Sequence, residues 1–215
     1  FHKPSKSLIV TDALVGIESN PPELFDLDPT PLLFHSRESG NELLVDSKEA
    51  RLKGWKRLVL FASFLRPEKL SIPSLIEIFK NSFKYGVRNP RVHFGIFPFS
   101  WDEDWESSSK ELLKSVGPLI QIAPVLERLV FPRARERYIF WLDKVISLKG
   151  LRWLISSHYS APVRFSNNDA SSMKRRIIQR NWAPSKGNWA FLYGLDKKLL
   201  KLGVVPTDPF NGFRD

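Results

Sequence analysis

The chain has 215 residues, of which 42% are hydrophobic and 13% aromatic, enough for one packed domain rather than a disordered segment. It contains no cysteine, which excludes a disulfide framework, a thiolate metal site and a cysteine nucleophile, and leaves four histidines with Asp and Glu as metal-ligand candidates. The net charge of +10 is typical of a solvated basic surface, or of a surface for an anionic membrane, a nucleic acid or an acidic partner.

The first residues have the pattern of a β-hairpin. Turn formers fill Pro4–Ser7, and an apolar strand over Leu8–Thr11 leads to Asp12 at its carboxyl end. At this position Asp12 is a candidate metal ligand, and it is equally a candidate for an ordinary strand-end or helix N-cap aspartate. Because Phe1 begins within this hairpin, we expect protein before it, including room for a targeting peptide or a membrane anchor. The proline-rich segment Glu18–Pro31 is predicted to be a loop.

Two helices are predicted next. The first covers Ser47–Leu65 with Ser47 as its cap, and its run Leu58–Leu65 is apolar nearly all round, which predicts either deep burial or a place on a membrane surface. The second covers Pro73–Tyr85 and ends at Gly86. Its apolar positions are predicted to face the interior; they are Leu75, Ile76, Ile78, Phe79 and Phe83.

A strand is predicted over Val92–Phe99, followed by the acidic and aromatic turn Trp101–Trp105. This turn opens a predicted helix over Glu106–Ser115. Negative charge at the start of a helix complements the helix dipole, which accounts for the three carboxylates. A cation site is the alternative interpretation of the same residues.

The carboxyl-terminal part alternates helix and strand. A helix over Ala134–Leu148 leads through Gly150 to a short strand over Leu151–Ile155, whose apolar run suits a strand covered on both faces. His158 follows the carboxyl end of this strand, where open α/β sheets bind ligands and metals. Two further helices are predicted over Asn167–Arg180 and Asn188–Leu202.

Motifs that name a chemistry are absent from the sequence. It holds no phosphate-binding glycine loop, no dinucleotide fingerprint, no nucleophile elbow and no H-x-H-x-D-H cluster. No apolar run is long enough for a membrane-spanning helix. Basic residues form a candidate surface for an anionic partner or a membrane; they are Lys53, Lys56, Arg57, Lys174, Arg175, Arg176 and Arg180.

Several segments, taken in order, resemble one known family. They are FHKPSKSLIVTD, SNPPELFDLDPTPLLFHSRES, KGWKRLVLFASFLRP, PFSWDEDW, IAPVLERLV and RWLISSHYSAPV. The chain resembles the long plant and algal branch of the domain of unknown function 4336 family, which is similar to the metallo-β-lactamase fold. The resemblance implies an α/β fold, namely the carboxyl-terminal half of an αββα sandwich. It implies one partial domain over residues 1–205, with a helical insertion at about 47–115 and an irregular tail over 206–215.

The resemblance also implies a chloroplast location and a place for a metal. In metallo-β-lactamase hydrolases a strand-end aspartate bridges two metals and a later strand-end histidine completes the second site, and Asp12 and His158 match these two places. The main histidine cluster belongs to the half of the fold that precedes Phe1, and the family is degenerate there. The implied cofactor is zinc or iron, or no metal at all.

Three functions follow as hypotheses. The first is a degenerate, non-catalytic structural or assembly component of a chloroplast complex at the photosynthetic, or thylakoid, membrane, with a protein complex or a membrane surface as partner. The second is a metal-dependent hydrolase of an ester, lactone or phosphodiester, with Asp12 and His158 as ligands. The third is a nucleic-acid-binding protein, and it has the least support because no base-reading module is recognisable.

Overall fold

The computed structural model describes residues 1–85, 96–110, 112–113, 119–179 and 186–206. The strands are β1 (Ser7–Val10), β2 (Val15–Ile17), β3 (Leu70–Ser71), β4 (Ser100–Trp101), β5 (Leu119–Gln121), β6 (Trp153–Ser156) and β7 (Val163–Arg164). The helices are α1 (Leu24–Leu27), α2 (Thr30–Ser36), α3 (Lys48–Phe64), α4 (Leu75–Tyr85), α5 (Glu106–Ser109), α6 (Pro124–Leu129), α7 (Arg135–Ile146), α8 (Asn167–Gln179) and α9 (Ala190–Lys201).

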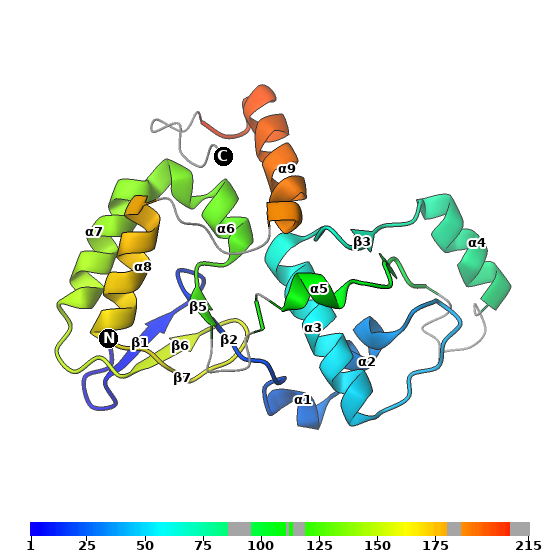
Figure 1. Ribbon diagram of the computed structural model, residues 1–215, viewed down its shortest axis with the longest axis horizontal. Coiled ribbons are helices and arrows are strands. Elements are labelled where there is room, and N and C mark those ends of the chain that lie inside the picture. Colours follow the sequence, from blue (N-terminus) through cyan, green and yellow to red (C-terminus); the bar gives the residue numbers. More distant parts are fainter. Residues whose placement is uncertain (86–95, 111, 114–118, 180–185, 207–215) are drawn as a thin grey trace.

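The chain is mixed α/β with small sheets, arranged as two neighbouring groups of elements (Figure 1). One group holds the sheet β1-β6-β7 with α7 and α8. The other is helical and is built around α3, with α4 at the far edge of the molecule. The division into a sandwich domain with an insertion at about 47–115 stays a prediction.

The three-stranded sheet joins β1, near the start of the chain, to β6 and β7, which follow more than a hundred residues later. β1 pairs with β6 in parallel, and β7 pairs with β6 in antiparallel orientation. Leu8 and Leu154 are opposite each other in the β1–β6 register and are both buried, together with Leu142 of α7. The strands predicted at Leu8–Thr11 and Leu151–Ile155 are therefore confirmed, within two residues at their ends.

Within the residues that the structure describes, the two faces of this sheet differ in how well they are covered. Helices α7 and α8 pack over the face that carries Leu8 and Leu154 (Figure 1). On the other face Ile9 is exposed, and Trp153 and Ile155 are half-buried. The expectation that β6 is covered on both faces is wrong in the described part of the chain, since its residues alternate in burial as in a sheet with one packed face.

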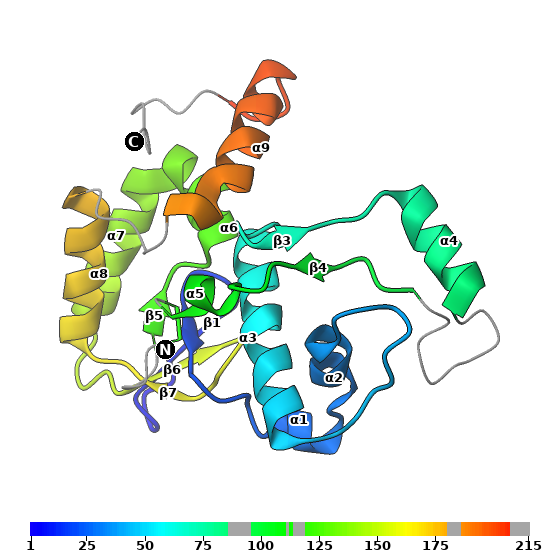
Figure 2. The same ribbon diagram turned by 45° about the vertical axis from the view of Figure 1, so that its right-hand side comes forward.

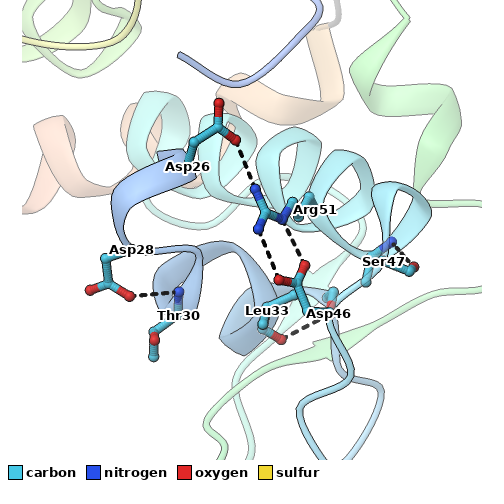
Figure 3. Close-up of polar contacts among 9 residues, drawn as sticks. Asp26, Asp28, Thr30, Leu33, Asp46, Ser47 and Arg51 are labelled. Carbon is cyan, nitrogen blue, oxygen red and sulfur yellow. Dashed lines mark hydrogen bonds and ion pairs between the residues drawn. The ribbon is translucent and has the colours of Figure 1, made fainter. Parts of the chain in front are cut away.

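The start of the helical group is fixed by polar contacts around α3. The Ser47 hydroxyl caps the helix by accepting a hydrogen bond from the Ala50 amide at 3.1 Å, as predicted. Arg51 donates to Asp26 of α1 at 2.8 Å and to both oxygens of Asp46 at 2.6 and 2.8 Å (Figure 3). These bonds tie α1 and the segment before α3 to the first turn of α3.

Helices α2 and α3 pack closely because Gly54 has no side chain. A Cβ atom at Gly54 would lie 1.8 Å from the Leu32 carbonyl oxygen, so no other residue fits at this crossing. Further along α3, Val59, Leu60 and Phe64 are fully buried. The apolar run Leu58–Leu65 is thus a core element, and the alternative of a membrane-facing α3 is wrong.

Helix α4 confirms the predicted helix but not its predicted orientation. Four of its apolar side chains were expected to face the interior, yet each is between 63% and 77% exposed; they are Leu75, Ile76, Phe79 and Phe83. The side of α4 that turns toward the protein carries Ile78, which is half-buried, and Ser82, which is buried. Periodicity defined an apolar face correctly, but it could not show that the described part of the chain leaves this face exposed.

Other boundaries differ in smaller ways. The short helix α1 and the start of α2 occupy part of the segment Glu18–Pro31, which was predicted to be a loop. Residues 96–99 of the predicted strand Val92–Phe99 are not in a strand, and residues 92–95 lie outside the described residues. The helix predicted over Glu106–Ser115 ends at Ser109, with 111 and 114–115 outside that description. Helices α7, α8 and α9 are confirmed.

No helix in the described part of the chain combines the length and apolarity needed to cross a membrane.

Candidate functional site

Asp12 and His158 meet because their strands are parallel neighbours in matching register. Val10 of β1 lies opposite Ser156 of β6, and Asp12 and His158 each follow two residues later. The chain continues in parallel past the strand ends, where the Ser157 amide donates to the Thr11 carbonyl at 3.3 Å. His158 Nε2 consequently lies 2.8 Å from Asp12 Oδ1. The two residues that follow the strand ends are therefore in direct contact.

The loop after His158 is anchored at several points. The Ser156 hydroxyl donates to the His158 carbonyl at 2.8 Å, and Tyr159 takes a left-handed backbone conformation with φ 65°. The Tyr159 hydroxyl reaches the Ser63 hydroxyl of α3 at 3.2 Å, and its burial raises its pKa, so the phenol stays protonated. The Ser160 amide donates to the Gly16 carbonyl of β2 at 2.9 Å. These contacts fix the loop and with it the backbone of His158.

The donor set at this site is small. The described residues contain no group of three or more His, Cys, Asp or Glu side chains that could hold a metal ion. A catalytic zinc site normally takes three protein ligands, so Asp12 and His158 by themselves do not fit one. Among the other histidines, His2 bonds to Ser5 at 2.6 Å and His35 is buried in α2, while His93 lies outside the described residues.

Removing the Asp12–His158 contact is expected to change stability little. The side chains are 49% and 61% exposed, and exposed ion pairs contribute about 0–1 kcal/mol. Asp12→Asn and His158→Ala should each leave the free energy of unfolding within about 1 kcal/mol of the wild type in urea denaturation. A loss of several kcal/mol would instead show that the pair holds the Ser157–Pro162 loop and the strand ends together.

The basic residues proposed as a partner surface have diverse surroundings. Each of three lysines pairs with an acidic side chain: Lys53 with Glu38, Lys56 with Glu106, and Lys174 with Asp143. Arg175 is exposed and donates to the Ser172 hydroxyl at 3.1 Å. Arg180 lies outside the described residues.

Arg176 lines a small cavity between α8 and β5. The cavity has a volume of about 150 Å³, below the roughly 300–1,000 Å³ of pockets that hold drug-sized ligands. Its other lining residues are Ile120, Asp169, Ser172 and Met173.

Arg57 does not belong to any partner-facing surface, contrary to expectation. Its side chain is 1% exposed and points into the helical group. The guanidinium donates to the Arg37 carbonyl at 2.9 Å and to both oxygens of Glu38 at 2.8 and 3.0 Å. Burial lowers its pKa, and the hydrogen bond to Glu38 opposes that shift.

The tryptophans of the acidic turn explain how this cation is buried. The Arg57 guanidinium lies 4.6 Å from the ring centre of Trp105 and 5.4 Å from that of Trp101, within the range of cation–π attraction. Asp104 pairs with Lys69 at 2.9 Å, at the surface. The turn Trp101–Trp105 therefore surrounds a cation from this chain with aromatic rings, a role that the sequence analysis missed. The position of this arginine directly before the apolar run Leu58–Leu65 was the one available signal.

A second feature missed from the sequence is the surface made by α4. Leu75, Ile76, Phe79 and Phe83 form an exposed patch, called here the α4 apolar face. It lies at the edge of the molecule, far from the β1-β6-β7 sheet, in both views (Figures 1 and 2). Large exposed apolar patches of this kind mark sites of interaction with proteins or membranes.

The comparisons with known proteins identify the family. The family model described as "Domain of unknown function (DUF4336)" matches residues 1–175. Neither the comparison with curated proteins nor the comparison with solved structures found a match. Since the family model covers most of the chain and includes both strands, Asp12 and His158, the chain belongs to the DUF4336 family.

Proposed function

We propose that this protein is a non-catalytic structural or assembly component of a chloroplast complex at the photosynthetic membrane. The observation that carries the proposal is the α4 apolar face, with four large apolar side chains mostly in solvent. Exposure of this much apolar surface on one helix is costly in water and favours attachment to another surface. The chloroplast location rests on the resemblance to the plant and algal branch of the family.

Two further observations support the non-catalytic part of the proposal. The strand-end site offers one carboxylate and one imidazole, and these bind each other. In the described part of the chain, two buried arginines of the helical group pack against aromatic rings: Arg57 lies against two tryptophans, and Arg37 lies over Phe34 and Phe97. We propose that the fold is half of a metallo-β-lactamase-like sandwich, a relation supported by the sheet with one covered face.

Co-migration with large chloroplast assemblies on a native gel tests the proposal. The tagged full-length protein is expressed in the chloroplast, and membranes are solubilised with a mild detergent. We expect the protein at the mass of a large assembly, and the Asp12→Asn/His158→Ala variant at the same position. Migration as a free monomer throughout would contradict the assembly role.

The second candidate function is a metal-dependent hydrolase, favoured by the 2.8 Å contact between the two strand-end side chains. Because the described residues do not complete a catalytic zinc site, this function needs ligands from elsewhere in the full-length protein. Metal analysis of the gently purified full-length protein tests it. Stoichiometric zinc or iron that is lost in the Asp12→Asn/His158→Ala variant would favour the hydrolase over the non-catalytic role.

A further inference from the structure

The α4 apolar face is a continuous stripe along one side of the helix. With 3.6 residues per turn, Leu75, Phe79 and Phe83 follow one another at successive turns and Ile76 lies beside them, so the stripe covers about 100° of the circumference. Ile78 and Ser82 lie beside the Leu75 edge of the stripe, and they are the less exposed positions of α4. The stripe itself is exposed along the helix.

Lysines border this stripe. Lys80 and Lys84 are both exposed and lie one turn apart, next to the edge formed by Ile76 and Phe83. The acidic residue of α4 is Glu77, and the whole chain carries a net charge of +10. Lysine side chains at such an edge can extend their apolar stems along the stripe and keep their ammonium groups at a polar boundary.

We propose that α4 lies in the plane of an anionic membrane surface, with the α4 apolar face inserted among the acyl chains and Lys80 and Lys84 at the level of the headgroups. A short helix with an apolar stripe, a lysine-bearing flank and attachment at the edge of a basic domain has the features of an interfacial helix. Charge complementarity selects an anionic lipid surface as the partner. The inference deepens the proposed function, on which it rests for the site of attachment, by naming the surface that α4 contacts.

Vesicle co-sedimentation of the purified full-length protein provides the first test. The vesicles are of phosphatidylcholine alone or of phosphatidylcholine with phosphatidylglycerol. We expect the protein to bind the anionic vesicles. This binding should weaken about tenfold or more in Phe79→Ser/Phe83→Ser, because the variant loses two aromatic rings that insert among the acyl chains. Lys80→Gln/Lys84→Gln should weaken binding about tenfold on anionic vesicles, reduce its salt dependence, and leave binding to neutral vesicles unchanged.

A matched control is available on α1. Leu24 and Leu27 are 70% and 84% exposed, so Leu24→Ser/Leu27→Ser makes the same kind of change at exposed apolar positions elsewhere. We expect this variant to bind like the wild type. All the substituted side chains are exposed, and circular dichroism with thermal melting should show that each variant is folded. Equal losses in the α1 and α4 variants would overturn the assignment to α4.

Depth of insertion gives a second, independent readout. The 215 residues contain no cysteine, so Phe83→Cys provides one thiol within them for a polarity-sensitive dye, and Leu27→Cys provides the control. Any cysteine outside these residues is replaced by serine in both variants. The dye at position 83 should shift its emission to the blue on anionic vesicles, and the dye at position 27 should not. An unshifted dye at position 83 in vesicle-bound protein would overturn the insertion.

The outcomes separate this inference from the proposed function. A protein that does not bind vesicles yet migrates with a large assembly on the native gel overturns the lipid contact and leaves the assembly role standing. Self-association in solution that Phe79→Ser/Phe83→Ser abolishes would assign the α4 apolar face to a second copy of this chain and would also overturn the inference. Vesicle binding without co-migration supports the lipid contact and contradicts the complex.

Discussion

Arg57→Ala is expected to lower the free energy of unfolding by about 3–5 kcal/mol, whereas Lys53→Ala should lower it by under about 1 kcal/mol. Both side chains pair with the same carboxylate, that of Glu38. They differ in burial, since the Arg57 side chain is 1% exposed and the Lys53 side chain is 31% exposed. The comparison therefore separates the effect of burial from that of charge on one shared acceptor.

The large loss of stability expected for Arg57→Ala has two sources. Without the guanidinium, the buried carbonyl oxygen of Arg37 and the part-buried carbonyl oxygen of Ser36 lose this donor, and an unsatisfied buried group costs about 1–3 kcal/mol. The space between Trp101 and Trp105 is left as a cavity, which adds to the loss. Urea denaturation at neutral pH measures both variants. Equal and small losses for Arg57→Ala and Lys53→Ala would show that the helical group does not depend on the buried cation.

The strand-end positions of Asp12 and His158 could be predicted from the sequence, and their contact could not. Asp12 and His158 each follow an apolar strand, and polar residues at the carboxyl ends of neighbouring parallel strands lie at one edge of a sheet. The sequence could not show that β1 and β6 are neighbours in matching register, because more than a hundred residues separate them. The 2.8 Å contact is therefore a result of the topology.

Arg57 and α4 were misplaced for opposite physical reasons. Arginine is rarely buried, so a surface place was expected. Its burial depends on Trp101 and Trp105, more than forty residues later in the chain. For α4, the usual rule predicts that the apolar stripe faces the core. The rule assumes that a cover exists, and the described residues of this chain do not supply one for Leu75, Ile76, Phe79 and Phe83.

Two buried titratable side chains have shifted pKa values, and these shifts change the stability with pH in opposite directions. Burial raises the pKa of Glu127 in α6 to about 7, against the opposing positive charge of Arg176. Burial also lowers the pKa of His35 in α2 to about 4, and the positive charge of Arg57 adds to this shift. Glu127 Oε2 and His35 Nδ1 have no hydrogen-bond partner among the residues that the structure describes. Both groups therefore favour their neutral form in the folded protein.

The two shifts act with opposite sign. Between the ordinary pKa of 4.5 and about 7, the folded protein keeps the Glu127 proton that the unfolded chain releases, so stability falls as the pH rises. Between the ordinary pKa of 6.5 and about 4, the unfolded chain binds a proton on His35 that the folded protein does not, so stability falls as the pH falls. Where the windows overlap, the two contributions nearly cancel in the wild type.

Glu127→Gln is accordingly expected to raise the free energy of unfolding by about 3 kcal/mol at pH 8 and to change it little at pH 4. The amide has nearly the shape of the carboxyl group but needs no charge in the buried site. The exposed Glu136 of α7 provides the control, and Glu136→Gln should stay within about 0.5 kcal/mol of the wild type at both pH values. Urea denaturation at a series of pH values measures all the variants.

In Glu127→Gln, the remaining change of the free energy of unfolding with pH reports the titration of His35. In Glu127→Gln, stability should fall by about 3 kcal/mol as the pH drops from 6.5 to 4, because the opposing contribution is gone. Adding His35→Phe, which keeps an aromatic ring against Phe99 and Phe61, should remove that fall. An unchanged slope in the double variant would show that groups other than His35 carry the acid sensitivity. A Glu127→Gln variant no more stable than the wild type at pH 8 would show that this carboxylate is solvated in the folded protein.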